Sequence, residues 1–263
     1  MIGLVQILVA TCLLDSDFLA NPHHWQKLLI LALATMASAA GGYIINDYYD
    51  VKIDVLNKPR RVVVGRLISR RMSIILHGSL STLAVLGGLY LGWRIGALVA
   101  FSSFWLWLYS NQLKRLPLIG NVSIAMLTAI SVFLPSFLFP PATPQLRMYC
   151  LFAFWISVIR EIVKDMEDMK GDARHGCQTL PIVWGLPKTK TAIYVVAILF
   201  LVSFGLGSYW LGTTSLWLAM LLCIPTLLFF RELQKADTKK QFSRLSKACK
   251  WIMLIGTVSM VLI

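Results

Sequence analysis

The chain alternates long apolar runs with short polar connections from one end of the sequence to the other. A membrane-spanning helix needs roughly 20 mostly apolar residues, and about nine segments approach that length. Because 57% of the residues are hydrophobic and only 14% are charged, we do not expect a soluble globular fold. The segments predicted to cross a bilayer are residues 1–14, 27–45, 72–93, 95–109, 118–139, 146–163, 191–211, 213–230 and 248–263.

These segments predict an all-α, polytopic membrane protein that forms one domain over residues 1–263. The first segment is short for a complete span and lacks the basic start of a signal peptide, so we interpret it as a truncated first helix. The five cysteines are odd in number and form no CxxC pair, so we expect neither disulfides nor a zinc site.

The basic residues are distributed unevenly between the two sets of loops. The formal charge is +13, and 22 of the 25 Lys and Arg residues fall on one side of the predicted membrane. The three exceptions are Lys27, Arg94 and Arg147. The positive-inside rule makes the basic side cytoplasmic and accounts for the charge without nucleic acid as a partner. We therefore expect an inner-membrane protein with its N-terminus inside and its C-terminus outside.

Eight of the 12 acidic residues occupy two short stretches at the ends of predicted spans. In the first stretch, Asp47, Asp50 and Asp54 lie within roughly 60° of one another if the segment is helical. In the second, Glu161, Asp165, Asp168 and Asp172 share a similar arc, whereas Glu167 points elsewhere. Acids beside membrane spans are costly, so two such stripes require an explanation.

Both acidic stripes end spans that run from outside to inside, so they meet at the same membrane face. Asp50 and Asp168 are 118 positions apart, as are Asp54 and Asp172, and a basic loop follows each stripe. This constant offset favours two related four-helix halves plus one further helix.

Facing carboxylates repel one another unless cations lie between them. Mg²⁺ prefers oxygen ligands and usually binds one or two carboxylates together with water and substrate phosphates. The sequence therefore predicts a magnesium and diphosphate site between the stripes. Solvated helix ends are the ordinary alternative, but the match in period, parity and face argues against it.

At these residues the chain resembles the UbiA superfamily of intramembrane prenyltransferases, which have nine helices and two aspartate-rich motifs. Residues 46–54 fit the first motif, NDxxDxxxD, and residues 168–172 fit the second, DxxxD. Residues 57–61 and 65–69, together with 160–172, 179–181 and Gly185, are similar to the branch that makes digeranylgeranylglyceryl phosphate. The chain departs from that branch at residues 62–64, which are all valine, where a second Arg-Pro pair is often found.

The resemblance implies roles for individual residues. Asp50, Asp54, Asp168 and Asp172 are then catalytic and, together with Asn46, hold Mg²⁺ and the diphosphate, with Asp47 and Asp165 in support. Lys114 and Arg60 are expected to bind the diphosphate. Arg60 and Arg66 are expected to bind the acceptor, because Arg can hold a phosphate with two parallel hydrogen bonds.

The predicted reaction is Mg²⁺-dependent transfer of a geranylgeranyl-type chain from a prenyl diphosphate to a lipid-like acceptor among the membrane lipids, with a prenylglyceryl phosphate as first choice. An aromatic-ring prenyltransferase of quinone biosynthesis would use the same metal ligands and remains open. A cation transporter is a third reading, although transporters usually place their acids near the bilayer midplane. Aromatic rings can stabilise a carbocation, and six are available in neighbouring spans. They are Phe101, Phe104, Trp105, Trp107, Tyr109 and Trp155, most of which we expect to face lipid.

Overall fold

The computed structural model describes residues 1–14, 21–57, 62–211 and 216–262, and within those ranges every regular element is helical. An isolated backbone bridge between Val64 and Ile68 is the exception. The helices of the described ranges are α1 (Ile2–Leu8, continued by a π-helical turn, Val9–Leu14), α2 (Pro22–Asn57), α3 (Arg70–Leu91), α4 (Trp93–Asn111), η4 (Leu113–Arg115), α5 (Ile119–Phe133), η5 (Leu134–Phe137), α6 (Pro144–Arg174), α7 (Leu180–Leu211), α8 (Leu216–Lys235), α9 (Lys239–Val258) and η6 (Ser259–Leu262).

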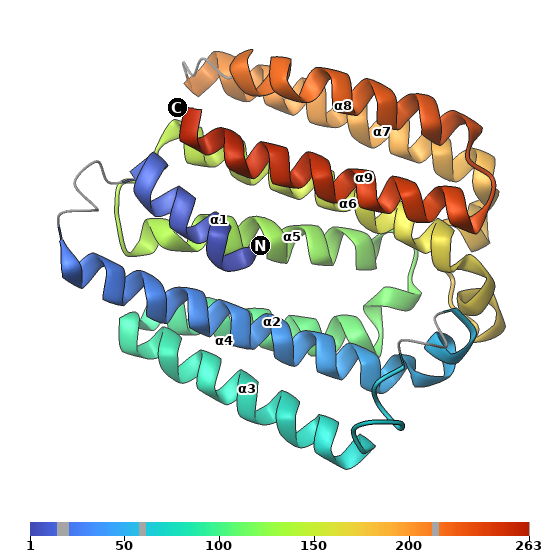
Figure 1. The fold of residues 1–263 in the computed structure, drawn as a ribbon, viewed down its shortest axis with the longest axis horizontal. Coiled ribbons are helices and arrows are strands. Elements are labelled where there is room, and N and C mark those ends of the chain that lie inside the picture. Colours follow the sequence, from blue (N-terminus) through green and yellow to red (C-terminus); the bar gives the residue numbers. More distant parts are fainter. Residues whose placement is uncertain (15–20, 58–61, 212–215, 263) are drawn as a thin grey trace.

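The long helices lie side by side in two groups, with the short α1 between them (Figure 1). In one group α2, α3 and α4 pack on one another, and in the other α6 packs against α5, α7 and α9. The contacts of α1 with α2 and of α2 with α3 have counterparts in those of α5 with α6 and of α6 with α7. This partial repeat agrees with the two halves expected from the spacing of the acidic stripes.

The predicted number of helices agrees with the structure, whereas several predicted bounds are too short. The described residues contain α1 to α9, of which five are long and apolar enough to cross a membrane. The predicted segment 27–45 belongs to a helix that runs to Asn57, and segment 146–163 belongs to one that runs to Arg174. Hydropathy marks where the apolar stretch ends, but the backbone continues as a helix until a residue interrupts it.

Helix α6 shows how local chemistry sets those ends. Thr143 caps its start by accepting a hydrogen bond from the backbone N–H of Leu146 at 3.2 Å, and Pro144 occupies the first turn. Its C-terminal turn is followed by Gly176 at φ 72°, a conformation that favours glycine. Polar residues between these two signals therefore remain helical, and the second acidic stripe lies on a continuous helix.

Small side chains bring the helices close together. Ser38 of α2 and Ser103 of α4 share a buried hydrogen bond of 2.8 Å. A Cβ at Gly42 would lie 2.7 Å from the side chain of Leu106, so glycine is what lets α2 approach α4 here. Small residues and interhelical hydrogen bonds are typical of packing between membrane helices, where apolar burial alone gives little driving force.

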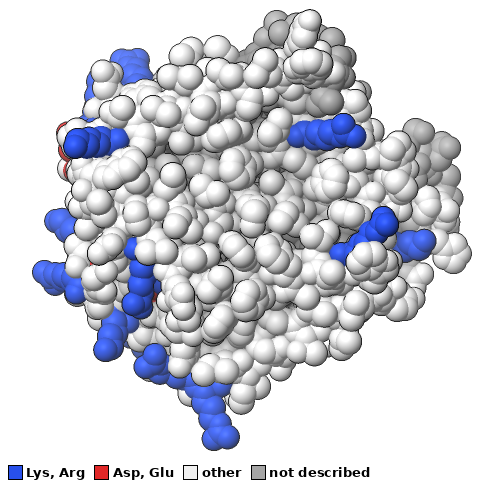
Figure 2. Space-filling view, turned by 180° about the vertical axis from the view of Figure 1, so that it is seen from behind, with Lys and Arg blue, Asp and Glu red and all other residues white. Residues whose placement is uncertain are grey.

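Charged side chains gather at one end of the molecule (Figure 2). That end carries most of the visible Lys and Arg side chains, a broad uncharged surface covers the middle, and a few basic side chains appear at the opposite end. Large apolar side chains are exposed on the described helices, such as Leu83, Leu86 and Leu201 at 63%, 57% and 67% exposure. Such a surface suits contact with lipid rather than water.

Candidate active site

The C-terminal part of α2 carries a buried ion pair with the turn after α4. Lys114 of η4 pairs with one carboxylate oxygen of Asp50, and the two side chains are only 9% and 15% exposed. Asn46, one turn earlier on α2, donates a 2.9 Å hydrogen bond to the other carboxylate oxygen. Lys114 also donates to Asn46 Oδ1 at 3.5 Å. Lys114, which the sequence predicts to bind the diphosphate, therefore contacts two residues of the first aspartate motif.

Burial and charge act on Lys114 in opposite directions. Burial lowers the pKa of its ammonium group, and the neighbouring Asp50 carboxylate partly offsets that effect. A negatively charged phosphate beside Lys114 would favour its protonated form further. The turn η4 thus places the Lys114 ammonium group beside the first motif, where it can pair with an anionic ligand.

Asn57 joins the two motif helices directly. Its amide nitrogen donates to the backbone carbonyl of Asp168 at 3.1 Å, and its amide oxygen accepts from the backbone N–H of Gly171 at 3.1 Å. A Cβ on Gly171 would lie within 2.4 Å of this amide, so the approach requires glycine. The turn of α6 between Asp168 and Asp172 is thereby fixed against the end of α2.

The predicted carboxylates lie at this shared end. Asp47, Asp50 and Asp54 are on the last turns of α2, and Asp168 and Asp172 are on the last turns of α6, all of them partly buried. Both helices end on the same side of the molecule (Figure 1). The structure thus brings the two stripes to one face, as their parity predicts.

Asp165 has a partner in the protein. Asn121 of α5 donates a 2.7 Å hydrogen bond to Asp165 Oδ2. This contact ties the carboxylate to α5. Its supporting role at a metal site remains a prediction.

Among the described residues, no three Asp, Glu, His or Cys side chains form a ready-made metal cluster. Magnesium does not require one, because it commonly uses one or two carboxylates and completes its octahedron with water and phosphate oxygens. The residues present offer carboxylates and an amide oxygen from two helices that Asn57 holds together. This donor set fits Mg²⁺ bound together with a phosphate ligand.

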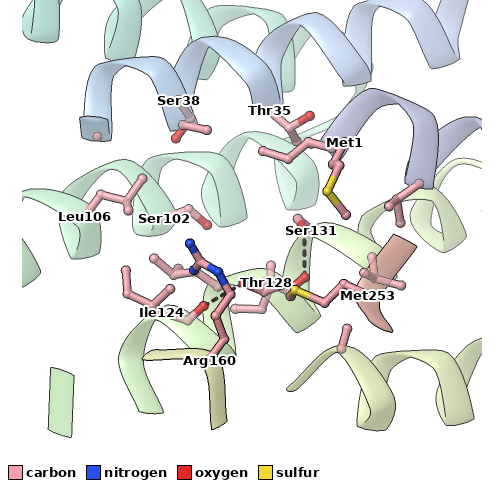
Figure 3. Close-up of a pocket in the computed structure, with 18 of the residues that line it drawn as sticks. Met1, Thr35, Ser38, Ser102, Leu106, Ile124, Thr128, Ser131, Arg160 and Met253 are labelled. Carbon is pink, nitrogen blue, oxygen red and sulfur yellow. Dashed lines mark hydrogen bonds between the residues drawn. The ribbon is translucent and has the colours of Figure 1, made fainter. Parts of the chain in front are cut away.

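A cavity of about 520 Å³ opens between α1, α2, α4, α5, α6 and α9. Asn46, Tyr109 and Ser110 line its polar part, and apolar side chains such as Ile124 and Phe152 line its deeper part. Figure 3 shows Ser38, Ser102, Leu106 and Thr128 around it. Its volume is within the range of roughly 300–1,000 Å³ that is usual for ligand sites. Because Asn46 lines the cavity and bonds Asp50, the chamber begins at the first motif.

Of the six aromatic residues proposed from the sequence, only Tyr109 lines this cavity. Phe101 and Phe104 are 39% and 55% exposed on the outer surface, and Trp155 donates a 2.9 Å hydrogen bond to Ser203. The majority therefore face away from the chamber, as expected.

Of the two arginines predicted to bind substrates, the structure describes only Arg66. Arg60 lies outside the described residues. Arg66 is exposed on a turn after α2 whose backbone is closed by a 2.8 Å hydrogen bond from Gly65 to Ile68, and it does not line the cavity.

Sequence reasoning missed four contributors to this region. Arg160, Lys164 and Lys250 line the cavity, and Asn57 links the motifs. Asn57 follows Asp54 by three residues on the same helix, a spacing that extends the acidic stripe and offered a signal. Lys250 gave none, because only tertiary packing brings α9 to the cavity.

Comparison with known proteins identifies one matching family model, the UbiA prenyltransferase family, over residues 8–254. Among curated relatives, digeranylgeranylglyceryl phosphate synthase of Methanothermobacter thermautotrophicus is 35% identical over 61% of this chain. That match spans only 57% of the relative's length. The synthase of the same name from Methanococcoides burtonii is 31% identical over 98% of this chain and 92% of its own.

Solved structures share the fold. One of them is a structure described as that of digeranylgeranylglyceryl phosphate synthase. It has a TM-score of 0.73 and 26% identity, and the match covers 99% of this chain and 91% of that structure's chain. A UbiA homologue from Archaeoglobus fulgidus, bound to DMAPP and Mg²⁺, has a TM-score of 0.72 at 12% identity and covers 100% of this chain and 95% of its own.

Proposed function

The chain belongs to the UbiA prenyltransferase family, and from that membership and the geometry of its site we propose that it is a Mg²⁺-dependent intramembrane prenyltransferase. It moves a prenyl chain of geranylgeranyl type from a prenyl diphosphate to a lipid-like acceptor, as a single domain over residues 1–263. The observation that carries the proposal is the meeting of two aspartate motifs, joined by Asn57, beside a cavity that begins at Asn46 of the first motif.

Each part of the site has a chemical role in this reaction. Asp50, Asp54, Asp168 and Asp172 are the catalytic carboxylates and hold Mg²⁺ and the diphosphate together with Asn46, and Asp47 and Asp165 support them. Mg²⁺, when bound, supplies positive charge to the departing diphosphate. Lys114 adds a second cation there, which stabilises charge that grows as the allylic C–O bond breaks.

The cavity holds the prenyl chain and keeps water from the reacting carbon. Its apolar wall is provided by helices α4, α5 and α6. Exclusion of water matters because water would capture the allylic cation in place of the acceptor. The face of Tyr109, which lines the chamber, can stabilise positive charge on that carbon.

We propose a prenylglyceryl phosphate as the acceptor, which gains an ether bond at its free hydroxyl while the hydroxyl proton leaves to a base or to water. Two matters support this choice: the names of the relatives, and the excess of basic residues that follows α2. In this proposal Arg60 and Arg66 contact substrate headgroups at the membrane surface, and no nucleic acid takes part.

An acceptor panel tests the assignment. Purified protein is incubated with labelled geranylgeranyl diphosphate, Mg²⁺ and either a prenylglyceryl phosphate or an aromatic acid such as 4-hydroxybenzoate. Transfer to the glyceryl phosphate alone supports the proposal. Transfer to the aromatic ring alone makes the protein an aromatic-ring prenyltransferase with the same metal site, and binding of Mg²⁺ without any transfer would favour a transporter.

We place this site at the cytoplasmic face of the inner membrane. Support comes from the basic side chains that gather at one end of the molecule (Figure 2), the end at which α2 and α6 finish (Figure 1). A tag near Lys58 or Lys239 should be protected from an impermeant reagent added outside intact cells. Labelling of either position from outside would reverse the orientation.

A further inference from the structure

A second group of cations lies inside the cavity, apart from Lys114. Arg160 and Lys164 of α6 and Lys250 of α9 line the chamber, and Glu161 is the single Asp or Glu among its lining residues in the described part of the chain. Three cations therefore face one carboxylate. The cavity wall carries an excess of positive charge at a depth where apolar side chains surround it.

The geometry of this group shows that Glu161 is shared. Its side chain is 5% exposed, and one oxygen pairs with Arg160 while the other is 3.8 Å from Lys164 Nζ. Glu161 is thus the shared partner of Arg160 and Lys164, and among the lining residues of the described chain cations outnumber carboxylates. Arg160 reaches from α6 into the cavity, toward Ser38 and Ser102 on the opposite wall (Figure 3).

Excess charge in a chamber of low dielectric is costly unless an anion compensates it. A phosphate monoester carries up to two negative charges and three acceptor oxygens at neutral pH. The planar guanidinium of an arginine can bind two of those oxygens at once, and a lysine adds a point charge. The chemistry of the cavity wall thus matches an anionic group such as a phosphate rather than a neutral headgroup.

The position of the group separates it from the diphosphate site. Lys164 precedes Asp168 by four residues and Arg160 precedes it by eight, so the two cations lie roughly 6 and 12 Å deeper along α6. An anion held here is distinct from a diphosphate held between the aspartate motifs. Both anions share one cavity, since Asn46 and Arg160 line the same chamber.

From these observations we propose that Arg160, Lys164 and Lys250 form the subsite for the phosphate of the acceptor lipid. The subsite orients the acceptor so that its free hydroxyl faces the reacting carbon of the donor, and it selects phosphorylated over neutral acceptors. This assignment rests on the proposed function, and it moves the main recognition of the acceptor from the loop after α2 into the cavity.

A binding experiment tests the subsite without turnover. The full chain in nanodiscs of phosphatidylcholine is titrated with a single-chain glyceryl ether phosphate whose free hydroxyl is methylated, and with its dephosphorylated counterpart. We expect the wild type to prefer the phosphate by about tenfold or more, the scale of a hydrogen bond to a charged group. Arg160→Gln, and more so Arg160→Gln with Lys250→Gln, should remove most of this preference.

Lys247→Gln is the matched control, because Lys247 is a basic residue on α9 three positions earlier that does not line the cavity. It should leave the preference unchanged, and Arg160→Lys should retain part of it. An equal loss of affinity for both lipids in Arg160→Gln indicates a purely structural role and overturns the subsite. So does competition by phosphatidylglycerol as effective as that of the glyceryl ether phosphate, since the group would then bind any anionic headgroup.

Kinetics separate failure of the subsite from failure of the proposed function. Arg160→Gln should raise the KM of the phosphorylated acceptor about tenfold while the KM of the prenyl diphosphate stays within about twofold. Turnover with unchanged acceptor preference in this variant refutes the subsite alone. Phosphate-dependent binding without prenyl transfer to any acceptor refutes the proposed function and leaves an anion site in the cavity.

Discussion

The two helices that carry the aspartate motifs are alike at their ends and different in their middle turns. Both α2 and α6 end with carboxylates spaced four residues apart, and both ends lie on the same face. Toward the cavity, however, α2 presents Thr35, Ser38 and Gly42, whereas α6 presents Arg160, Glu161 and Lys164. The two helices are therefore alike where we propose that metal and diphosphate bind, and they differ where we propose that the rest of the substrates fit.

This difference indicates that the two halves bind different parts of the substrates. The cation beside α2 is Lys114, which comes from η4 and contacts Asp50 directly. The cations beside the equivalent part of α6 belong to that helix itself and lie deeper. We infer that the α2 half mainly holds the diphosphate of the donor, while α6 serves the metal with its last turns and the acceptor with the turns before them.

The carboxylates should show the largest effects, and equal effects in the two halves. Asp50→Asn and Asp168→Asn should each lower turnover by about 100-fold or more, because each removes a charge that we propose to hold Mg²⁺ and the diphosphate. Turnover is measured with labelled donor at saturating Mg²⁺, and EDTA should abolish it reversibly. Glu167→Gln is the control: its carboxylate lies on another face of α6, and we expect a change within about twofold. Near-normal turnover in either aspartate variant would refute the shared metal site.

Replacement of Lys114 should cause the next largest loss of turnover, and this loss belongs to the α2 half alone because Lys114 contacts Asp50. Lys114→Gln should lower kcat by about 10- to 100-fold, since it removes a partly buried cation at the leaving group. Arg115→Gln, its exposed neighbour, should change kcat by less than about threefold. Similar losses in both variants would mean that the two residues act only through the general basic charge of this face.

The contact of Asn57 with the Asp168–Gly171 turn of α6, which joins the two halves, can be tested with a double-mutant cycle. Gly171→Ala would place a Cβ about 2.4 Å from Asn57, so we expect turnover to fall about tenfold and the Tm by several degrees. Asn57→Ala alone loses two hydrogen bonds and should cost less. The double variant should be no worse than Asn57→Ala, because the clashing side chain is gone. Additive losses in activity and in thermal melting would show that the joint is not what aligns the motifs.

The sequence predicted the helices and the common face of the motifs because both follow from local periodicity. Hydropathy gave the number of helices, and the 118-residue offset gave the parity of Asp50 and Asp168. The bounds failed at the ends of α2 and α6, where charged residues stay helical outside the apolar stretch. Hydropathy reports the environment of a segment, and backbone hydrogen bonding decides where its helix stops.

The cavity could not be predicted in the same way. Arg160 and Glu161 read as members of a charged run, and only the packing of α6 against α5 and α9 shows that they line an enclosed chamber. Lys250 is more than 80 residues away in sequence and reaches the same chamber through tertiary contacts alone. Lys114 was predicted through the family resemblance, and its direct contact with Asp50 required the fold.

The cysteine that follows the second motif, Cys177, should have no role in the reaction. Its side chain is buried, and Asp172 and Lys114 lie close enough to affect it electrostatically. Burial is the main cause that raises the pKa of this thiol, and the Asp172 carboxylate raises it further, so it stays protonated at neutral pH. A protonated thiol is neither a nucleophile nor a magnesium ligand, so Cys177→Ser should keep turnover within about twofold of the wild type. Replacing all five cysteines should likewise leave measurable activity. Loss of turnover in Cys177→Ser with an unchanged melting temperature would contradict this prediction and would mean that the thiol takes part in the reaction.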